Sequence, residues 1–117
     1  MALPQLTLNL TQGSVSFNFT PDAAKDLQTA IAQLMESLKV TTQAKGSGSK
    51  PSPQKPTEYQ FSGGSVFLEV FCNPNIWPTP FAAKVLITLR DEHIRLTTEA
   101  ELTRLIEDLS QYLEQVG

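Results

Sequence analysis

Few side chains in this chain of 117 residues could take part in catalysis, and their spacing does not favour a shared site. His93 is the only histidine, so a metal site built from several histidines is excluded, and no metal site is expected. Asp91 and Glu92 precede it directly. Adjacent residues of a hairpin turn point in different directions and are well solvated, so these three predict a charged turn rather than an acid–base site. Glu107 and Asp108 lie on the polar side of a predicted helix, where a solvated face is expected.

Cys72 is the only cysteine, which excludes an internal disulfide and favours a reducing compartment. No cation lies near it in the sequence to lower its pKa, so a structural thiol is expected. Cys72 and His93 could serve as nucleophile and base only if the fold joined them. No predicted helix follows Gly46-Ser47-Gly48, so a phosphate-binding loop is not indicated. We therefore expect a protein that is not an enzyme and has no cofactor.

Size and composition predict one soluble, cytoplasmic domain spanning residues 1–117. Hydrophobic residues make up 40% of the chain, which suffices for one core. No apolar run approaches the roughly 18 residues of a membrane span, and Met1–Gln5 has no signal-peptide character. Three of the nine basic residues lie in residues 41–57, leaving six against twelve acidic residues elsewhere. This balance argues against a nucleic acid or an anionic membrane as the partner.

Alternating apolar and polar residues predict two hairpins, one near each end of the chain. In residues 6–10 and 15–19 every second residue is apolar, and Gln12-Gly13 between them fits a hairpin turn. Residues 85–89 and 94–96 repeat this pattern on either side of a charged turn. Both hairpins are therefore expected to place one face against a core.

Each hairpin is followed by a predicted amphipathic helix. The first begins at Thr20 as its N-cap with Pro21 at the first helical position, and the second begins at Thr98, which forms a capping box with Glu101. The apolar stripes of the two helices are Ala24, Leu27, Ile31, Leu34, Met35 and Leu38, and then Leu102, Leu105, Leu109, Tyr112, Leu113 and Val116. The order strand–strand–helix thus occurs twice, and either an internal ββα repeat or a chance likeness of two amphipathic segments explains it.

Residues 41–57 have the composition of a flexible linker. They contain glycine, serine, proline and lysine but no large apolar residue. Such a segment cannot bury enough surface to offset the entropy of ordering it. We therefore expect a flexible linker at 41–57.

Between the two hairpins lies a segment with no counterpart in the first half of the chain. Residues 65–72 predict a strand behind a turn signal at Ser62-Gly63-Gly64. Phe67 and Phe71 lie on the opposite face from Val66, Leu68 and Val70, so both faces are apolar, as in a central strand. Residues 73–81 then predict a loop stiffened by prolines.

Together these elements predict an α+β fold, an antiparallel sheet of about five strands with two helices on one face. The other face would carry Phe67, Phe71 and Leu86, rimmed by the loop residues Ile76, Trp77 and Phe81. A contiguous apolar patch of this kind typically marks an interface, so the expected partner is a protein or peptide, or a second copy of the chain in a homodimer. In the alternative interpretation, the loop folds over the sheet and buries Trp77 in a small core of its own.

Residues 72–87 read Cys-Asn-Pro-Asn-Ile-Trp-Pro-Thr-Pro-Phe-Ala-Ala-Lys-Val-Leu-Ile, and the likeness continues into residues 90–92 and 96–99. This half of the chain resembles a small family of cyanobacterial proteins and is similar to a carboxysome shell-assembly chaperone. The resemblance implies a small α+β protein with a non-enzymatic role. It further implies that the region of Phe67, Phe71 and Trp77 holds an extended tail of a shell protein.

Overall fold

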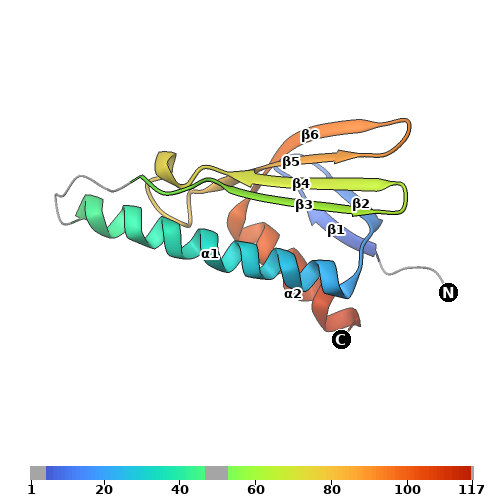
Figure 1. The fold of residues 1–117 in the computed structure, drawn as a ribbon, viewed down its shortest axis with the longest axis horizontal. Helices are drawn as coiled ribbons and strands as arrows, with labels where there is room; N and C mark the ends of the chain where they lie inside the picture. The colour runs from blue at the N-terminus through green and yellow to red at the C-terminus, as the bar shows by residue number, and fades with distance from the viewer. Residues whose placement is uncertain (1–4, 47–52, 117) are drawn as a thin grey trace.

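The computed structural model describes residues 5–46 and 53–116, with side chains described outside 43–46 (Figure 1). The elements, in chain order, are β1 (Gln5–Asn9), β2 (Ser14–Asn18), α1 (Pro21–Gly46), β3 (Thr57–Gly63), β4 (Val66–Cys72), the 3₁₀ helix η1 (Pro74–Ile76), β5 (Lys84–Arg90), β6 (Arg95–Glu101) and α2 (Leu102–Val116). Within these ranges, no helix combines the length and the apolar character that a membrane span requires.

The predicted α+β class is confirmed, with two helices and antiparallel strands. The prediction of one sheet of about five strands is wrong, because the described strands form a two-stranded sheet, β1–β2, and a four-stranded sheet in the order β3-β4-β5-β6. The additional strand is β3, which pairs with β4 across a turn in which Gly64 adopts a φ of 59°. The glycine-rich signal therefore marks the turn, but Gly63 itself belongs to β3.

The four-stranded sheet has a buried inner face and an open outer face. Leu68, Val70, Val85 and Ile87 point to the inner face, where they join one core with residues of both helices and of the β1–β2 hairpin. The helices and the hairpin thus lie on the same side of this sheet (Figure 1). The opposite face is left without a covering element among the described residues.

The first helix begins as predicted but ends later. Thr20 Oγ1 accepts a hydrogen bond from the Ala23 N–H at 3.1 Å, which confirms Thr20 as the N-cap. The helix continues to Gly46, so the predicted linker at 41–57 is wrong for its first six residues. Thr41 is buried, and its hydroxyl donates a hydrogen bond to the Leu38 C=O. The buried face of α1 therefore continues through this polar residue. Residue 57 already belongs to β3, and residues 47–52 lie outside the described part of the chain.

The predicted start of the second helix is also wrong. Thr98 lies in β6 opposite Ile87, and α2 begins at Leu102, whose N–H donates to the Ala83 C=O at 3.0 Å. In the register with β5, Thr98 forms a hydrogen-bonded pair with Ile87, so its backbone N–H does not need the Glu101 side chain that a capping box would supply. Since β6 passes into α2 without a connecting loop, the two strand–strand–helix segments differ at this junction. The internal repeat stays a prediction.

Candidate functional site

The six residues predicted to form a binding surface do not come together in the structure. Phe67, Phe71 and Leu86 do lie on the outer face of the four-stranded sheet, with Phe71 opposite Leu86. A polar row formed by Glu69 and Thr88, which pair across β4 and β5, separates Phe67 from the other two. The outer face is therefore a mixed surface and not one contiguous apolar patch.

The loop residues lie elsewhere again. η1 and the loop after it pack against the C-terminal half of α1, where Thr42 donates a hydrogen bond to the Pro78 C=O at 3.3 Å. Ile76 and Phe81 are 64% and 85% exposed, whereas Trp77 is half-buried against the core. Trp77 therefore does not stand on the predicted surface, and it packs against the main core rather than in a small core of its own, as the alternative interpretation had it.

Cys72 behaves as a structural thiol. It is buried at the end of β4, and burial raises the pKa of its thiol to about 11, although a hydrogen bond from the Trp77 side chain opposes the increase. His93 lies in the turn beyond β5, at the opposite end of the sheet from Cys72. The fold therefore does not join the two as nucleophile and base.

The raised pKa predicts a slow reaction of Cys72 with alkylating reagents. Against the ordinary value of 9.0, a pKa about two units higher lowers the thiolate fraction at pH 8 by about 100-fold. We expect iodoacetamide to modify the folded protein at least about 100 times more slowly than the protein unfolded in urea. Mass spectrometry of timed samples measures both rates, and equal rates would contradict the burial of this thiol.

The charged turn is solvated, as predicted. Asp91, Glu92 and His93 are all exposed. The N–H groups of His93 and Ile94 donate to Asp91 Oδ1 at 2.8 and 2.7 Å and lower the pKa of this carboxyl. These hydrogen bonds shape the turn. Across the described residues, no three His, Cys, Asp or Glu side chains are placed to hold a metal ion.

A different site emerges where the two sheets meet. The hairpin turn is hydrogen-bonded to β6, because the N–H and the hydroxyl of Thr11 both donate to the Glu99 C=O, at 3.2 and 3.1 Å. From this junction β2 and β6 diverge toward the turns of the larger sheet (Figure 1). Since β2 pairs only with β1 and β6 only with β5 in the described part of the chain, each strand has an open edge.

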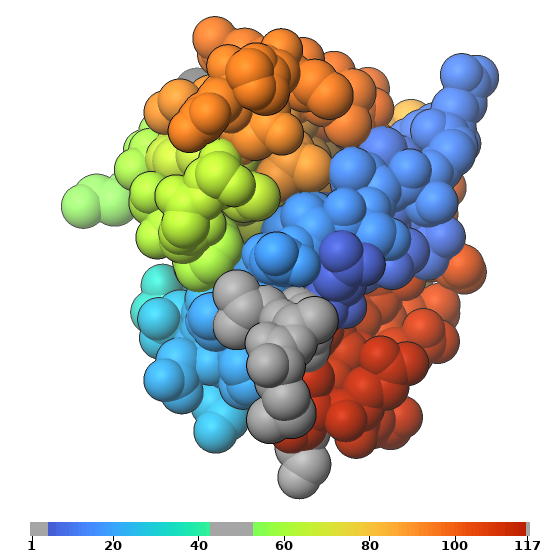
Figure 2. Space-filling model, turned by 90° about the vertical axis from the view of Figure 1, so that its right-hand side faces the viewer, coloured from blue at the N-terminus to red at the C-terminus, as the bar shows by residue number. Residues whose placement is uncertain are grey.

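A pocket of about 350 Å³ occupies this divergence, and we call it the edge pocket. Figure 2 looks on to this end of the molecule, where the β1–β2 hairpin, the β3–β4 turn and the β5–β6 hairpin converge. The apolar lining of the edge pocket consists of Val15, Phe17, Val66, Leu89, Ile94 and Leu96. Its polar lining consists of Gln5, Ser16, Asn18, Arg90 and Asp91. Ile94 is 66% exposed, so an apolar side chain stands at the mouth. An apolar lining with a polar border is typical of a binding site.

The backbone directions along the two open edges follow from the hairpin hydrogen bonds. In an antiparallel ladder, backbone groups alternate between the paired side and the open side. Leu10 N–H donates to Gly13 C=O, and this register turns the backbone groups of Ser16 and Asn18 to the open side of β2. The bond from Asp91 N–H to Ile94 C=O likewise turns those of Arg95 and Thr97 to the open side of β6.

Sequence patterns alone did not identify the edge pocket. Its lining comes from separate strands and a turn, and Val15, Val66 and Leu96 each occupy an ordinary core-facing position in the alternating pattern. Ile94 gives the one local signal, because a large apolar residue directly after an exposed charged turn has little to pack against.

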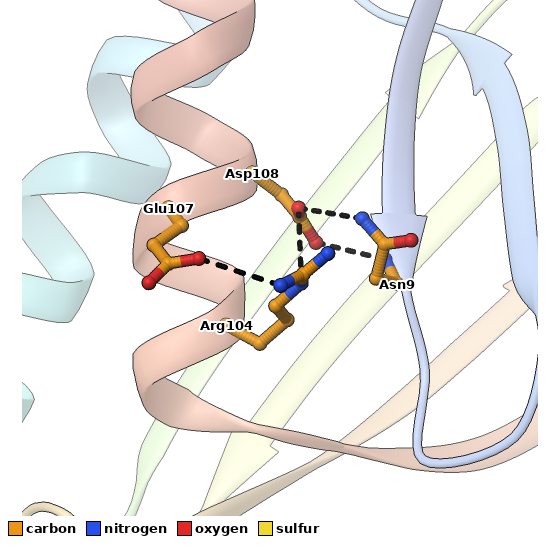
Figure 3. A network of polar contacts seen from close by, with 4 residues as sticks. All are labelled: Asn9, Arg104, Glu107 and Asp108. Carbon is orange, nitrogen blue, oxygen red and sulfur yellow. Dashed lines mark hydrogen bonds and ion pairs between the residues drawn. The ribbon is translucent and has the colours of Figure 1, made fainter.

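A buried carboxylate fixes the wall that the hairpin forms. Asp108 on α2 is 4% exposed, and its two oxygens accept hydrogen bonds from the backbone N–H and the side-chain amide of Asn9, both at 2.8 Å (Figure 3). Arg104 Nε lies 3.8 Å from the same carboxylate, and the arginine also pairs with the exposed Glu107. The expectation that Asp108 lies on a solvated helix face is wrong. Its hydrogen bonds hold the open edge of β1 against α2, and with it the position of β2.

No family model matches this chain, and no curated protein or solved structure matches it either.

Proposed function

We propose that this protein is a non-catalytic binding module that holds part of a partner protein in the edge pocket. The observation that carries the proposal is an apolar pocket placed between two open strand edges, with Ile94 exposed at its mouth. Apolar pockets with backbone groups beside them suit a peptide, because side chains fill the pocket while the main chain forms hydrogen bonds. The cytoplasmic location expected from the sequence belongs to the same proposal.

The narrower proposal is that the protein is an assembly chaperone for a carboxysome shell protein. Its support is the resemblance of residues 72–87, 90–92 and 96–99. The resemblance implies that Phe67, Phe71 and Trp77 hold the tail, but none of these residues lines the edge pocket. The proposal therefore moves the tail to the edge pocket, whose volume of about 350 Å³ accommodates one or two side chains of a longer segment.

A homodimer is the second candidate, favoured by the exposed apolar residues at the opposite end of the molecule. Phe81 and Ile76 are the most exposed apolar side chains there, and Leu86 is 42% exposed on the outer face. A second copy of the chain would cover them. This candidate uses residues of the surface predicted from the sequence, whereas the edge pocket does not.

One pair of matched variants tests the proposal. Peptides of twelve random residues are displayed and selected against the full chain, and the affinity of each binder is measured by titration. We expect Ile94→Ser to weaken the binders at least about fivefold, because truncating an apolar anchor typically costs more than about 1 kcal/mol. Phe81→Ser is the control, since it makes the same kind of change at an exposed site at the far end.

The opposite result, in which only Phe81→Ser weakens binding, would assign binding to the loop end of the molecule. Light scattering at increasing concentration tests the homodimer. A dimer that Phe81→Ser dissociates would establish the second candidate, and a monomer at every concentration would remove it. Both replaced side chains are exposed, so neither variant should change stability by more than about 0.5 kcal/mol.

A further inference from the structure

We infer that the edge pocket takes an extended peptide segment that pairs with the open edge of β6 and carries acidic side chains on either side of an apolar one. The inference rests on the proposed function and adds the conformation and the charge of the bound segment.

The edge of β6 is open over a defined length. Among the outward backbone groups of this strand, the Glu99 C=O is already used, because it accepts from Thr11 N–H. The N–H and C=O groups of Arg95 and Thr97 point the same way and have no strand beside them in the described part of the chain. The bond from Thr11 therefore closes one end of the edge, and the rest can accept a short added strand.

Pairing along β6 places the side chains of an added strand in a fixed alternation. Successive side chains of a strand point to opposite faces of the sheet. A residue opposite Leu96 shares its face and enters the edge pocket beside Leu89 and Val15. The residues before and after it share the outer face with Arg95 and Thr97. The bound segment therefore needs one apolar residue that enters the edge pocket, and the residues on either side of it lie on the outer face.

The outer face at this edge carries two arginines side by side. Arg95 lies directly opposite Arg90 in the ladder, and like charges in this position destabilise a sheet. Arg90 lies over the ring of Phe67 at 4.5 Å. Within residues 5–46 and 53–116, neither guanidinium has a carboxylate oxygen within 4.0 Å. An acidic side chain opposite Arg95 would relieve this repulsion and pair with the donor fork of the guanidinium.

The acidic residues near this edge do not supply that carboxylate. Glu69 on the outer face accepts a hydrogen bond from the Gln60 amide at 2.9 Å. Asp91 accepts two backbone N–H groups within its own turn. Glu92 lies in the same exposed turn, and Glu99 lies two positions beyond Thr97, where Thr11 ends the open edge. The positive charge of Arg95, which has no carboxylate beside it in the described residues, thus favours an acidic over a basic segment.

The competing edge is that of β2, the other wall of the edge pocket. It offers the backbone groups of Ser16 and Asn18, but no charged side chain lies on β2 to select for charge. Arg90 and Asp91, which line the same pocket, carry opposite charges and offset each other. An added strand at β2 would therefore show little preference between acidic and basic segments. Charge preference and the position of the protected amides separate the two edges.

Two synthetic peptides test the inference with the full chain. The acidic peptide is acetyl-Thr-Glu-Val-Glu-Leu-Thr-amide, and the basic peptide replaces both glutamates by lysine. We expect the acidic peptide to bind at least about tenfold tighter at low salt, with a difference that shrinks at high salt because exposed charges are screened. Hydrogen exchange should slow at the amides of Arg95 and Thr97 when the acidic peptide is bound.

The charge variant is Arg95→Glu, which should reverse the preference between the two peptides. Lys25→Glu on α1 is the control, because it changes the net charge equally at an exposed position away from β6 and should keep the order. Equal binding of both peptides would overturn the charge assignment. Protection at Ser16 and Asn18 instead would overturn the assignment to β6 but not the proposed function. A selection that yields no binder dependent on Ile94 would overturn the proposed function itself.

Discussion

Replacing Phe19 by alanine is expected to lower the free energy of unfolding by about 3–5 kcal/mol, the largest stability effect of a single substitution that we predict. Phe19 is fully buried, and its ring makes edge-to-face contacts with Phe17, Phe61 and Tyr112 at centroid distances of 5.7, 4.8 and 5.9 Å. Truncation removes both the apolar burial and these ring contacts, and the surrounding elements cannot close the cavity without moving.

The location of Phe19 explains why the effect should be large. It lies between β2 and α1, and its ring contacts reach β3 through Phe61 and α2 through Tyr112. Its C=O also accepts a hydrogen bond from the Tyr112 hydroxyl at 2.9 Å. One residue therefore joins the small sheet to the large one and to the second helix.

Urea unfolding followed by the fluorescence of Trp77, the only tryptophan, measures this effect. Phe19→Leu refills most of the volume and should cost about 1–2 kcal/mol, so the two variants form a graded pair. Phe81→Ala removes the same ring from a site that is 85% exposed and should stay within about 0.5 kcal/mol of the original protein. A change below about 1 kcal/mol for Phe19→Ala would contradict the described core.

Local patterns in the sequence predicted several elements correctly. Alternation identified β1, β2, β5 and the strand at 66–72, and the cap at Thr20 fixed the start of α1. The capping-box pattern at Thr98 failed because pairing with β5 competes for the same residues, and sequence spacing does not reveal that pairing. β3 was missed because the signals that flank it, prolines before and glycines after, are those of a loop.

The candidate site shows where prediction from local patterns ends. Alternation correctly placed Phe67, Phe71 and Leu86 on one face, since the alternation within each strand decides which face of the sheet a side chain lies on. Whether the three touch depends on register between strands, and the register puts Phe71 opposite Leu86 but places Glu69 and Thr88 between this pair and Phe67. The edge pocket depends on how far β2 diverges from β6. Hydrogen bonds between residues 99 positions apart, from Asn9 to Asp108, hold β1 in place and so help to set that divergence.

The hydrogen bonds of Asp108 are the subject of the second large prediction. Asp108→Ala is expected to lower the free energy of unfolding by about 2–4 kcal/mol, because it removes two hydrogen bonds to a charged acceptor and leaves the Asn9 N–H without that partner. The nearby Arg104 adds little, since it is half exposed and lies 3.8 Å from the carboxylate. Asp108→Asn keeps one acceptor oxygen and should cost about half as much, roughly 1–2 kcal/mol.

Glu107→Ala is the matched control for Asp108→Ala, because it removes a neighbouring carboxylate that is 63% exposed and pairs with the same arginine. It should change stability by less than about 0.5 kcal/mol.

A double-mutant cycle with Asn9→Ala isolates the side-chain part of the interaction, and we expect a coupling of about 1–2 kcal/mol. Equal effects of Asp108→Ala and Glu107→Ala would mean that the buried carboxylate stabilises the fold no more than the exposed one. In that case β1 would be held by apolar packing alone. In Asp108→Ala the hairpin should loosen at its α2 side, so hydrogen exchange of β1 should accelerate more than that of β4.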